Sequence, residues 1–294
     1  MTNNFGLGVA LITPFQENGE VDYSALKTHV NRLIESDVNY LIALGTTSEY
    51  VTLSDYERQM VLNTIIETTN KRKPIILGVG GNNTRHVIEE IKKVPTDIFG
   101  ILSVTPYYNK PSQQGLFTHF REVALATDKP VILYNVPGRT AVNMSPQITI
   151  ELAQQFSNII GIKEASGDIN QIMEIIRLKP NSFQVISGDD ALTLPLIAAG
   201  ATGVISVVGN IYPKAFNKVV QLSLSNNFTE ARLIHNQLLP FISVLFEDGN
   251  PSGIKAAMSV LGYCSKIVRE PLSTVQDKTL DKINWLIKLL NELS

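Results

Sequence analysis

Short apolar segments alternate with longer amphipathic segments along most of this chain, and that alternation limits the folds it can adopt. The apolar segments are mostly continuous, as expected for parallel strands whose two faces are both covered. Eight of them occur in series, which predicts an α/β fold, a (β/α)8 TIM barrel with a C-terminal helical extension. An open doubly wound sheet is the alternative, although it would usually have fewer strands and a glycine-rich first turn. The predicted strands are 7–13, 40–45, 75–79, 98–104, 130–135, 159–163, 183–187 and 203–208.

The intervals between these strands have the residue pattern of amphipathic helices. Ser54 lies three residues before Glu57, which is the spacing of a capping box. Ser145 and Pro146 supply a cap and a proline at the first helical position. The predicted helices are 22–35, 54–70, 85–93, 113–127, 146–156, 169–178, 191–199 and 213–227.

Three further helical patterns follow the eighth unit, at about 229–246, 251–262 and 278–292. The last of them has apolar residues at helical spacing. A chain of 294 residues fits one barrel of about 250 residues with an extension better than it fits two domains. We therefore predict a catalytic barrel over 1–227 and a helical extension over 228–294.

Charge and cysteine content narrow the possible partners. The chain has 25 Lys and Arg against 27 Asp and Glu, without the basic stripe or charged tail that suggests nucleic acid or an anionic membrane. No apolar run approaches the roughly 18 residues of a membrane span, and the run 6–15 lacks a basic leader. Cys264 is the only cysteine, which fits a reducing, cytoplasmic location. The four histidines show no metal-ligand spacing, so we expect small-molecule substrates, no metal and no cofactor.

Lys163 is the first catalytic candidate. It ends the predicted strand 159–163, so a segment expected to be buried carries an amine at its C-terminal end. A charged amine is costly to bury, and in a partly desolvated pocket an amine can attack a ketone to form a Schiff base and then an enamine. The alternative is a lysine that reaches the rim or pairs with a carboxylate.

Polar groups also follow several other predicted strands. In a barrel of this kind the active site lies at the C-terminal ends of the strands, so these groups are expected to meet at one mouth. They are Thr46, Thr47 and Glu49 after the second strand, Tyr107 and Tyr108 after the fourth, Tyr134 and Arg139 in and after the fifth, and Gly188, Asp189 and Asp190 after the seventh.

These groups suit the chemistry of a lysine Schiff base. Tyr134, relayed through Thr46, can supply the proton transfers that remove water and interconvert imine and enamine. Thr46 and Thr47 can hold the carboxylate of an α-keto acid, and the guanidinium of Arg139 can hold a second carboxylate. Taken singly, each is more often a structural or rim residue; their combination is what favours a site.

The acidic groups at the mouth have two readings. Glu49, Asp189 and Asp190 could act as acids or bases, but loop hydrogen bonding and helix capping is the favoured role.

At these residues the chain resembles the dihydrodipicolinate synthase family, within the N-acetylneuraminate lyase superfamily of Schiff-base aldolases. The matching segments span nearly the whole predicted barrel, and the segment 134–140 favours the synthases over the sialic acid lyases. They are Gly8-Val-Ala-Leu-Ile-Thr-Pro-Phe15, Gly45-Thr-Thr-Ser-Glu49, Thr105-Pro-Tyr-Tyr-Asn-Lys-Pro111, Tyr134-Asn-Val-Pro-Gly-Arg-Thr140, Gly161-Ile-Lys-Glu-Ala-Ser166, Ser187-Gly-Asp-Asp190 and Gly203-Val-Ile-Ser-Val207.

The resemblance implies a reaction and a set of roles. Pyruvate would form a Schiff base with a lysine, and its enamine would attack aspartate 4-semialdehyde, in the diaminopimelate route to lysine. A homo-oligomer, a dimer or a dimer of dimers, is implied as well, with a tyrosine reaching into a neighbouring subunit. The implied residues are Lys163 as nucleophile, Tyr134, Thr46 and Tyr108 as the proton relay with Tyr108 from the neighbour, and Thr47, Ile205, Gly188 and Arg139 in substrate binding.

Departures from the family pattern lie near a lysine feedback pocket that some relatives have at their dimer interface. We therefore expect weak or absent inhibition by lysine. The departing residues are Tyr50, Asp55, Arg58 and His86, whereas Asn82 and Tyr107 match.

Two other functions stay open on the sequence. One is a different pyruvate-dependent lyase, such as a sialic acid or sugar-acid lyase, for which Arg139 fits poorly. The other is a barrel that binds small acids without turning them over, which would have no need of Lys163, Tyr134 and Tyr108 together.

Overall fold

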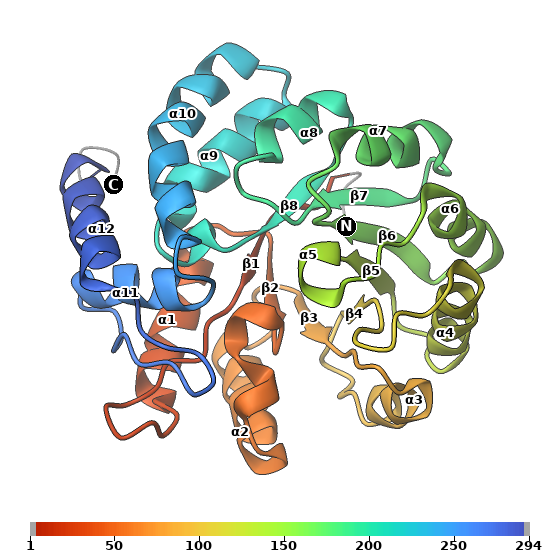
Figure 1. Cartoon of the computed structure of the whole chain (residues 1–294), viewed down its shortest axis with the longest axis horizontal. Helices are drawn as coiled ribbons and strands as arrows, with labels where there is room; N and C mark the ends of the chain where they lie inside the picture. Colours follow the sequence, from red (N-terminus) through yellow and green to blue (C-terminus); the bar gives the residue numbers. More distant parts are fainter. Residues whose placement is uncertain (1–3, 291–294) are drawn as a thin grey trace.

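A closed barrel of eight parallel strands forms the centre of the computed structural model, which describes residues 4–290 (Figure 1). Each strand pairs with the next in the sequence, and β8 pairs with β1 to close the barrel. The predicted (β/α)8 architecture is therefore confirmed, and the open sheet is excluded. The strands are β1 (Gly6–Ala10), β2 (Tyr40–Ala43), β3 (Ile75–Gly78), β4 (Gly100–Val104), β5 (Val131–Asn135), β6 (Ile159–Glu164), β7 (Gln184–Ser187) and β8 (Gly203–Ser206).

Helices follow the strands and surround the barrel. The capping box of Ser54 and Glu57 is present at the start of α2, as the sequence predicted. The prediction missed the one-turn helix α5 and three 3-10 turns at the strand ends, which are too short to show a periodic pattern. The barrel helices are α1 (Tyr23–Glu35), α2 (Asp55–Thr69), α3 (Thr84–Lys92), α4 (Gln113–Leu125), α5 (Pro137–Thr140), α6 (Pro146–Gln155), α7 (Ile169–Leu178), α8 (Thr193–Ala199) and α9 (Pro213–Leu224), and the turns are η1 (Thr46–Ser48), η2 (Tyr50–Thr52) and η3 (Val208–Asn210).

Four predicted strands are too long at their C-terminal ends. β2 ends at Ala43 and not at 45, and β3 ends at Gly78 and not at 79. β1 ends at Ala10 and not at 13, where the chain approaches Pro14, a residue without an N–H to extend a ladder. β8 ends at Ser206 and not at 208, because the next residues turn into η3. Apolarity alone does not distinguish a strand from the buried turn that follows it.

Large and small side chains share the barrel interior. Tyr40 on β2 is fully buried, and a Cβ atom on Gly8 of β1 would lie 2.2 Å from its ring. The hydroxyl of Tyr40 donates to the carbonyl of Val204 on β8 at 3.3 Å, so its polar end is satisfied inside the barrel. The interior at this level is thus a packed core.

Three helices follow the barrel units: α10 (Phe228–Leu245), α11 (Ser252–Val260) and α12 (Asp277–Leu290). Figure 1 shows them on one side of the barrel, with α10 beside α9 and α12. The predicted last helix runs to 292, and its last two residues lie outside the described range. The domain boundary at 227 stays a prediction, although α10 begins at Phe228. Within residues 4–290, none of the helices has the length and apolarity to cross a bilayer.

Gly253 on α11 lies against the end of α10, and this contact generates a stability prediction. A Cβ atom at Gly253 would lie 2.0 Å from the carbonyl oxygen of Leu245. For Gly253→Ala we expect a loss of about 1–3 kcal/mol from overpacking, which outweighs the gain of roughly 1 kcal/mol that alanine brings to a helix. Thermal unfolding should therefore show a lower Tm.

Gly81→Ala is the matched control, since its added Cβ would have its nearest neighbour at 3.4 Å. Its Tm should stay close to that of the unaltered chain. An unchanged Tm for Gly253→Ala would contradict the close approach of α11 to α10.

Candidate active site

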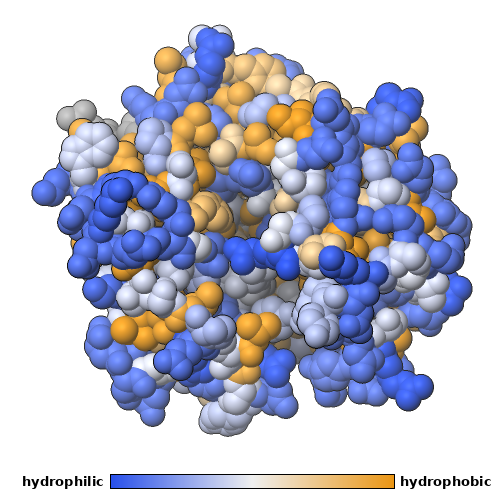
Figure 2. All heavy atoms as spheres, viewed as in Figure 1, coloured by the Kyte–Doolittle hydropathy of each residue, from blue (hydrophilic) through white to orange (hydrophobic). Residues whose placement is uncertain are grey.

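A cavity of about 820 Å³ opens at the C-terminal ends of the strands. Figure 2 shows the corresponding face of the molecule, which is hollowed near its centre. Residues from the loops after β2, β5, β6 and β7 line the cavity, and α10 closes one side. From the predicted site, the lining includes Thr46, Thr47, Tyr134, Arg139, Lys163 and Gly188.

Lys163 and Tyr134 lie side by side in the barrel wall. They are register partners on β6 and β5, and the Lys163 Nζ atom is 4.3 Å from the centre of the Tyr134 ring. Lys163 is only 7% exposed, so the amine is held in the cavity and does not reach the rim. A Cβ atom on Gly188 would lie 3.1 Å from the Lys163 Cε atom, so the missing side chain at Gly188 leaves room for the lysine.

The strand period places Glu164 on the opposite side of β6 from Lys163. Its carboxylate is buried and accepts from Asn135 Nδ2 at 3.0 Å, Gln171 Nε2 at 2.8 Å and the Ser166 N–H at 3.1 Å. Burial raises the pKa of Glu164, and these donors oppose that shift. Because Asn135 and Glu164 are the residues after Tyr134 and Lys163, this network fixes the two strands directly behind the amine and the phenol.

Thr46 and Thr47 form the η1 turn directly after β2. The Asn250 Nδ2 group donates to Thr47 Oγ1 at 3.0 Å. Because a hydroxyl has one proton and this one already accepts from Asn250, its own O–H is left to donate to a further acceptor. Thr47 is buried, and it lines the cavity, so a ligand carboxylate is a suitable partner.

Arg139 lies on α5, whose first residue is Pro137. Its side chain is exposed at the cavity, and its Nη2 atom donates to the carbonyl oxygen of Asn250 at 3.4 Å. The rest of the guanidinium fork is available to an anion in the cavity mouth. The short helix therefore brings the predicted second carboxylate binder to the same cavity as Lys163.

The acidic residues have structural contacts, in agreement with the favoured reading. Asp189 Oδ1 accepts from the N–H of Ala191 at 2.8 Å and caps its loop. Asp190 Oδ2 accepts from the N–H groups of Val207 and Val208 at 3.0 and 2.8 Å, directly after β8. Burial raises the pKa of Asp190 to about 6. Glu49, directly after η1, is buried and pairs with Lys255 on α11.

Two predicted site residues do not line the cavity of this chain. Tyr108 is 84% exposed and is not among the residues that line the cavity, and its φ of 74° is left-handed. Ile205 lies buried in the interior on β8, while Val207 lines the cavity next to it. The single chain therefore brings together six of the predicted groups and leaves Tyr108 on its surface.

Asn250 is the functional candidate that the sequence prediction missed. It contacts both Thr47 and Arg139, and its Oδ1 atom is buried without a hydrogen-bond partner among the described residues. An amide in a loop of the C-terminal extension has no local signal of its role. The prediction also missed the apolar wall that α10 and the residue after it add to the cavity. This wall consists of Leu239, Ile242 and Phe246.

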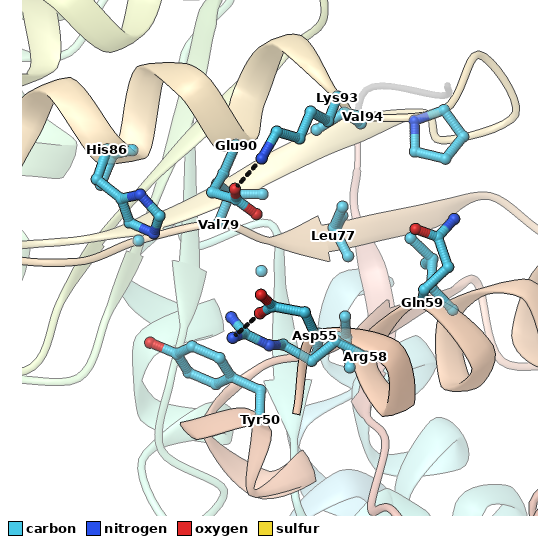
Figure 3. A pocket seen from close by; sticks show the side chains of 16 residues that line it. Tyr50, Asp55, Arg58, Gln59, Leu77, Val79, His86, Glu90, Lys93 and Val94 are labelled. Carbon is cyan, nitrogen blue, oxygen red and sulfur yellow. Dashed lines mark hydrogen bonds and ion pairs between the residues drawn. The ribbon is translucent and has the colours of Figure 1, made fainter. Parts of the chain in front are cut away.

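A second cavity of about 250 Å³ lies between α2 and α3 (Figure 3). It contains the four residues that depart from the family pattern, Tyr50, Asp55, Arg58 and His86. Arg58 and Asp55 pair with each other at 2.5 Å. The departures therefore cluster in space. Arg58 and Asp55 already pair with each other, so their charges are less available to a ligand.

The larger cavity has the groups of a carbonyl-condensing site. It combines a nearly buried primary amine, an adjacent phenol, hydroxyl donors and a guanidinium. An amine with a proton relay can form an imine with a ketone, while the hydroxyls and the guanidinium can hold two carboxylates.

Comparison with known proteins agrees with the chemistry of a carbonyl-condensing site. The model of the dihydrodipicolinate synthetase family matches residues 3–290. The 4-hydroxy-tetrahydrodipicolinate synthase of Flavobacterium psychrophilum is 50% identical over 288 residues, which cover 98% of each chain.

Solved structures agree with the sequence relatives. A chloride-inhibited dihydrodipicolinate synthase from Acinetobacter baumannii, in complex with pyruvate, is 38% identical with a TM-score of 0.94 over 98% of each chain. A chain described as the first monomeric dihydrodipicolinate synthase variant is 37% identical, with a TM-score of 0.95 over 98% of this chain and 97% of that one. This chain belongs to the dihydrodipicolinate synthetase family.

Proposed function

We propose that this protein is a 4-hydroxy-tetrahydrodipicolinate synthase, a Schiff-base lyase that condenses pyruvate with L-aspartate 4-semialdehyde. The observation that carries the proposal is the buried amine of Lys163 beside the phenol of Tyr134, in a cavity that also holds Thr47 and Arg139. Membership of the family supports the same activity.

The first half of the reaction joins pyruvate to the enzyme. The Lys163 amine adds to the C2 carbonyl of pyruvate, and the carbonyl oxygen leaves as water once protons have been delivered to it. Tyr134 is the adjacent acid and base, and Thr46 on the η1 turn is the relay group. Loss of a proton from the methyl group then gives the enamine, whose terminal carbon is the nucleophile.

The second half forms the new carbon–carbon bond. The enamine carbon attacks the aldehyde carbon of the semialdehyde, whose oxygen takes up a proton from the relay. The amino group of the same substrate then displaces the Lys163 nitrogen at the former C2, which closes the ring and frees the enzyme. No metal or cofactor enters these steps as we propose them.

Two carboxylates are held at different places. The Thr47 hydroxyl, left with its proton by the Asn250 contact, donates to the pyruvate carboxylate, and the backbone around Ile205 adds to that pocket. Gly188 keeps space beside the lysine side chain. Arg139 at the cavity mouth binds the carboxylate of the semialdehyde.

A homodimer completes the relay in this proposal, and two such dimers form a tetramer. Tyr108 is exposed on its own chain, so its phenol is available to a neighbouring subunit. One solved relative is described as a monomeric variant, so the oligomer of this chain needs its own measurement. The cytoplasm is the proposed location, in keeping with the free thiol of Cys264.

The other functions receive less support. Arg139, whose side chain lies at the cavity mouth, fits a sialic acid or sugar-acid lyase poorly. A binding protein for small acids needs no buried amine beside a phenol.

Lys163→Ala tests the nucleophile. We expect pyruvate-dependent consumption of aspartate 4-semialdehyde to fall by at least about 10³-fold, because none of the other described residues that line the cavity carries an amine. Borohydride with pyruvate should label Lys163 in the unaltered chain, as read by peptide mass spectrometry, and should leave the variant unlabelled.

Lys214→Ala is the control, because that lysine is exposed on α9 outside the cavity. Its activity and labelling should be unchanged. Labelling without consumption of the semialdehyde would keep the Schiff base and reject the proposed aldehyde, whereas no labelling would reject the mechanism.

Hybrid dimers test the origin of Tyr108. Lys163→Ala and Tyr108→Phe should each be nearly inactive, and co-expressed chains with different tags yield the hybrid. If Tyr108 serves the neighbour, one site of the hybrid has both groups, so we expect about half of the unaltered rate per dimer. A hybrid as inactive as either parent would show that Tyr108 acts within its own chain. An active Tyr108→Phe parent would show that Tyr108 has no catalytic part.

Titration with L-lysine tests the second cavity. We expect about 10 mM lysine to reduce the initial rate less than twofold, since Asp55 and Arg58 pair with each other and Tyr50 occupies part of the space. A lysine-sensitive relative assayed in parallel is the control. Strong inhibition at low lysine would contradict the expectation.

A further inference from the structure

A fully buried ion pair lies behind the η1 turn and has no part in the steps above. Lys255 on α11 and Glu49 directly after η1 approach to 2.5 Å between Nζ and Oε1. Their side chains are 0% and 1% exposed. Taking two charges out of water is costly, so such a pair persists only where further contacts support both partners.

The ammonium group of Lys255 has such contacts. It donates to the carbonyl oxygen of Ile267 at 3.0 Å and lies 3.8 Å from the centre of the Phe15 ring. Burial lowers the pKa of Lys255, and the carboxylate of Glu49 opposes that shift. The cation is therefore held by an anion, a carbonyl and an aromatic face that come from different parts of the chain.

Glu49 has an unusual backbone conformation for its residue type. Its φ is 56°, in the left-handed region, which a residue with a side chain adopts at a cost in free energy. Its N–H donates to the carbonyl of Thr46 at 3.3 Å and closes the η1 turn. Its second carboxylate oxygen accepts from the N–H of Arg269 at 2.9 Å. Both oxygens of Glu49 thus contact the C-terminal segment.

We infer that the Lys255–Glu49 pair positions the η1 turn, and through it the hydroxyls of Thr46 and Thr47 at the pyruvate carboxylate and the proton relay. Neither Lys255 nor Glu49 lines the cavity, so both act through the turn and neither is a catalytic residue. The inference rests on the proposed function, and it assigns to the C-terminal extension a part in binding pyruvate.

The test replaces the pair by apolar residues of similar size, in Lys255→Met/Glu49→Leu. Such a replacement can leave stability unchanged, because no charge is stranded in the interior. It removes both contacts that the carboxylate of Glu49 makes with the C-terminal segment. The two roles of the pair are then distinguishable. The Tm measures its effect on stability, and pyruvate binding measures its effect on the position of the η1 turn.

The readout is the pyruvate concentration that half-saturates borohydride labelling of Lys163, together with the KM for pyruvate. We expect both values to rise at least about tenfold in the double variant, because a small displacement of a positioning group has large effects. The Tm should stay near that of the unaltered chain. Glu49→Gln keeps the shape of the side chain and should shift both values severalfold, even if the double variant does not fold.

Phe183→Leu is the control for general loss of stability. Phe183 is buried at the opposite end of the barrel, next to the start of β7. This variant should lower the Tm without changing the pyruvate values. Unchanged pyruvate values in a folded variant of the pair would overturn the inference alone. Absence of labelling in the unaltered chain would overturn the proposed function and this inference together.

Discussion

A closed barrel of parallel strands brings the C-terminal end of every strand to one mouth, and the site depends on that constraint. Neighbouring strands also keep a fixed register through their backbone hydrogen bonds. Tyr134 and Lys163 are 29 positions apart in the chain, yet the β5–β6 register places them side by side. The buried network behind them, centred on Glu164, stabilises that register at the point where the chemistry is proposed.

The second constraint is the C-terminal extension. Asn250 contacts Thr47 and Arg139, and Lys255 contacts Glu49, so the extension supports the site through these contacts. Without the extension, the loop after β2 would lose its contacts with Asn250, Lys255 and Arg269. Loops that carry functional groups need a rigid support to hold a useful geometry. In this chain the support comes from a segment about 200 residues away in the sequence.

The chemistry of the cavity follows from burial as much as from residue identity. Lys163 is nearly buried, while Arg139 is exposed at the rim. A buried amine is suited to covalent chemistry, whereas an exposed guanidinium is suited to capture of an anionic substrate. Gly188 contributes by having no side chain, since a Cβ atom there would crowd the lysine. The same residue types in other positions would make an ordinary charged surface.

The sequence by itself determined the fold class and six of the residues that line the cavity. Eight continuous apolar runs predicted the barrel, and the residues after them predicted Thr46, Thr47, Tyr134, Arg139, Lys163 and Gly188 at one mouth. This succeeded because strand ends in a parallel barrel share one side whatever the details of packing.

Only the tertiary structure decided how the site is supported and which groups belong to it. Asn250 and Lys255 lie in a helical extension whose docking has no periodic signal, so their contacts with the β2 loop were not predictable. Tyr108 lies on the surface of its own chain, and its place in the site of a neighbouring subunit stays a prediction. The physical reason is that hydrophobic periodicity reports local burial, whereas contacts between distant segments depend on how those segments pack.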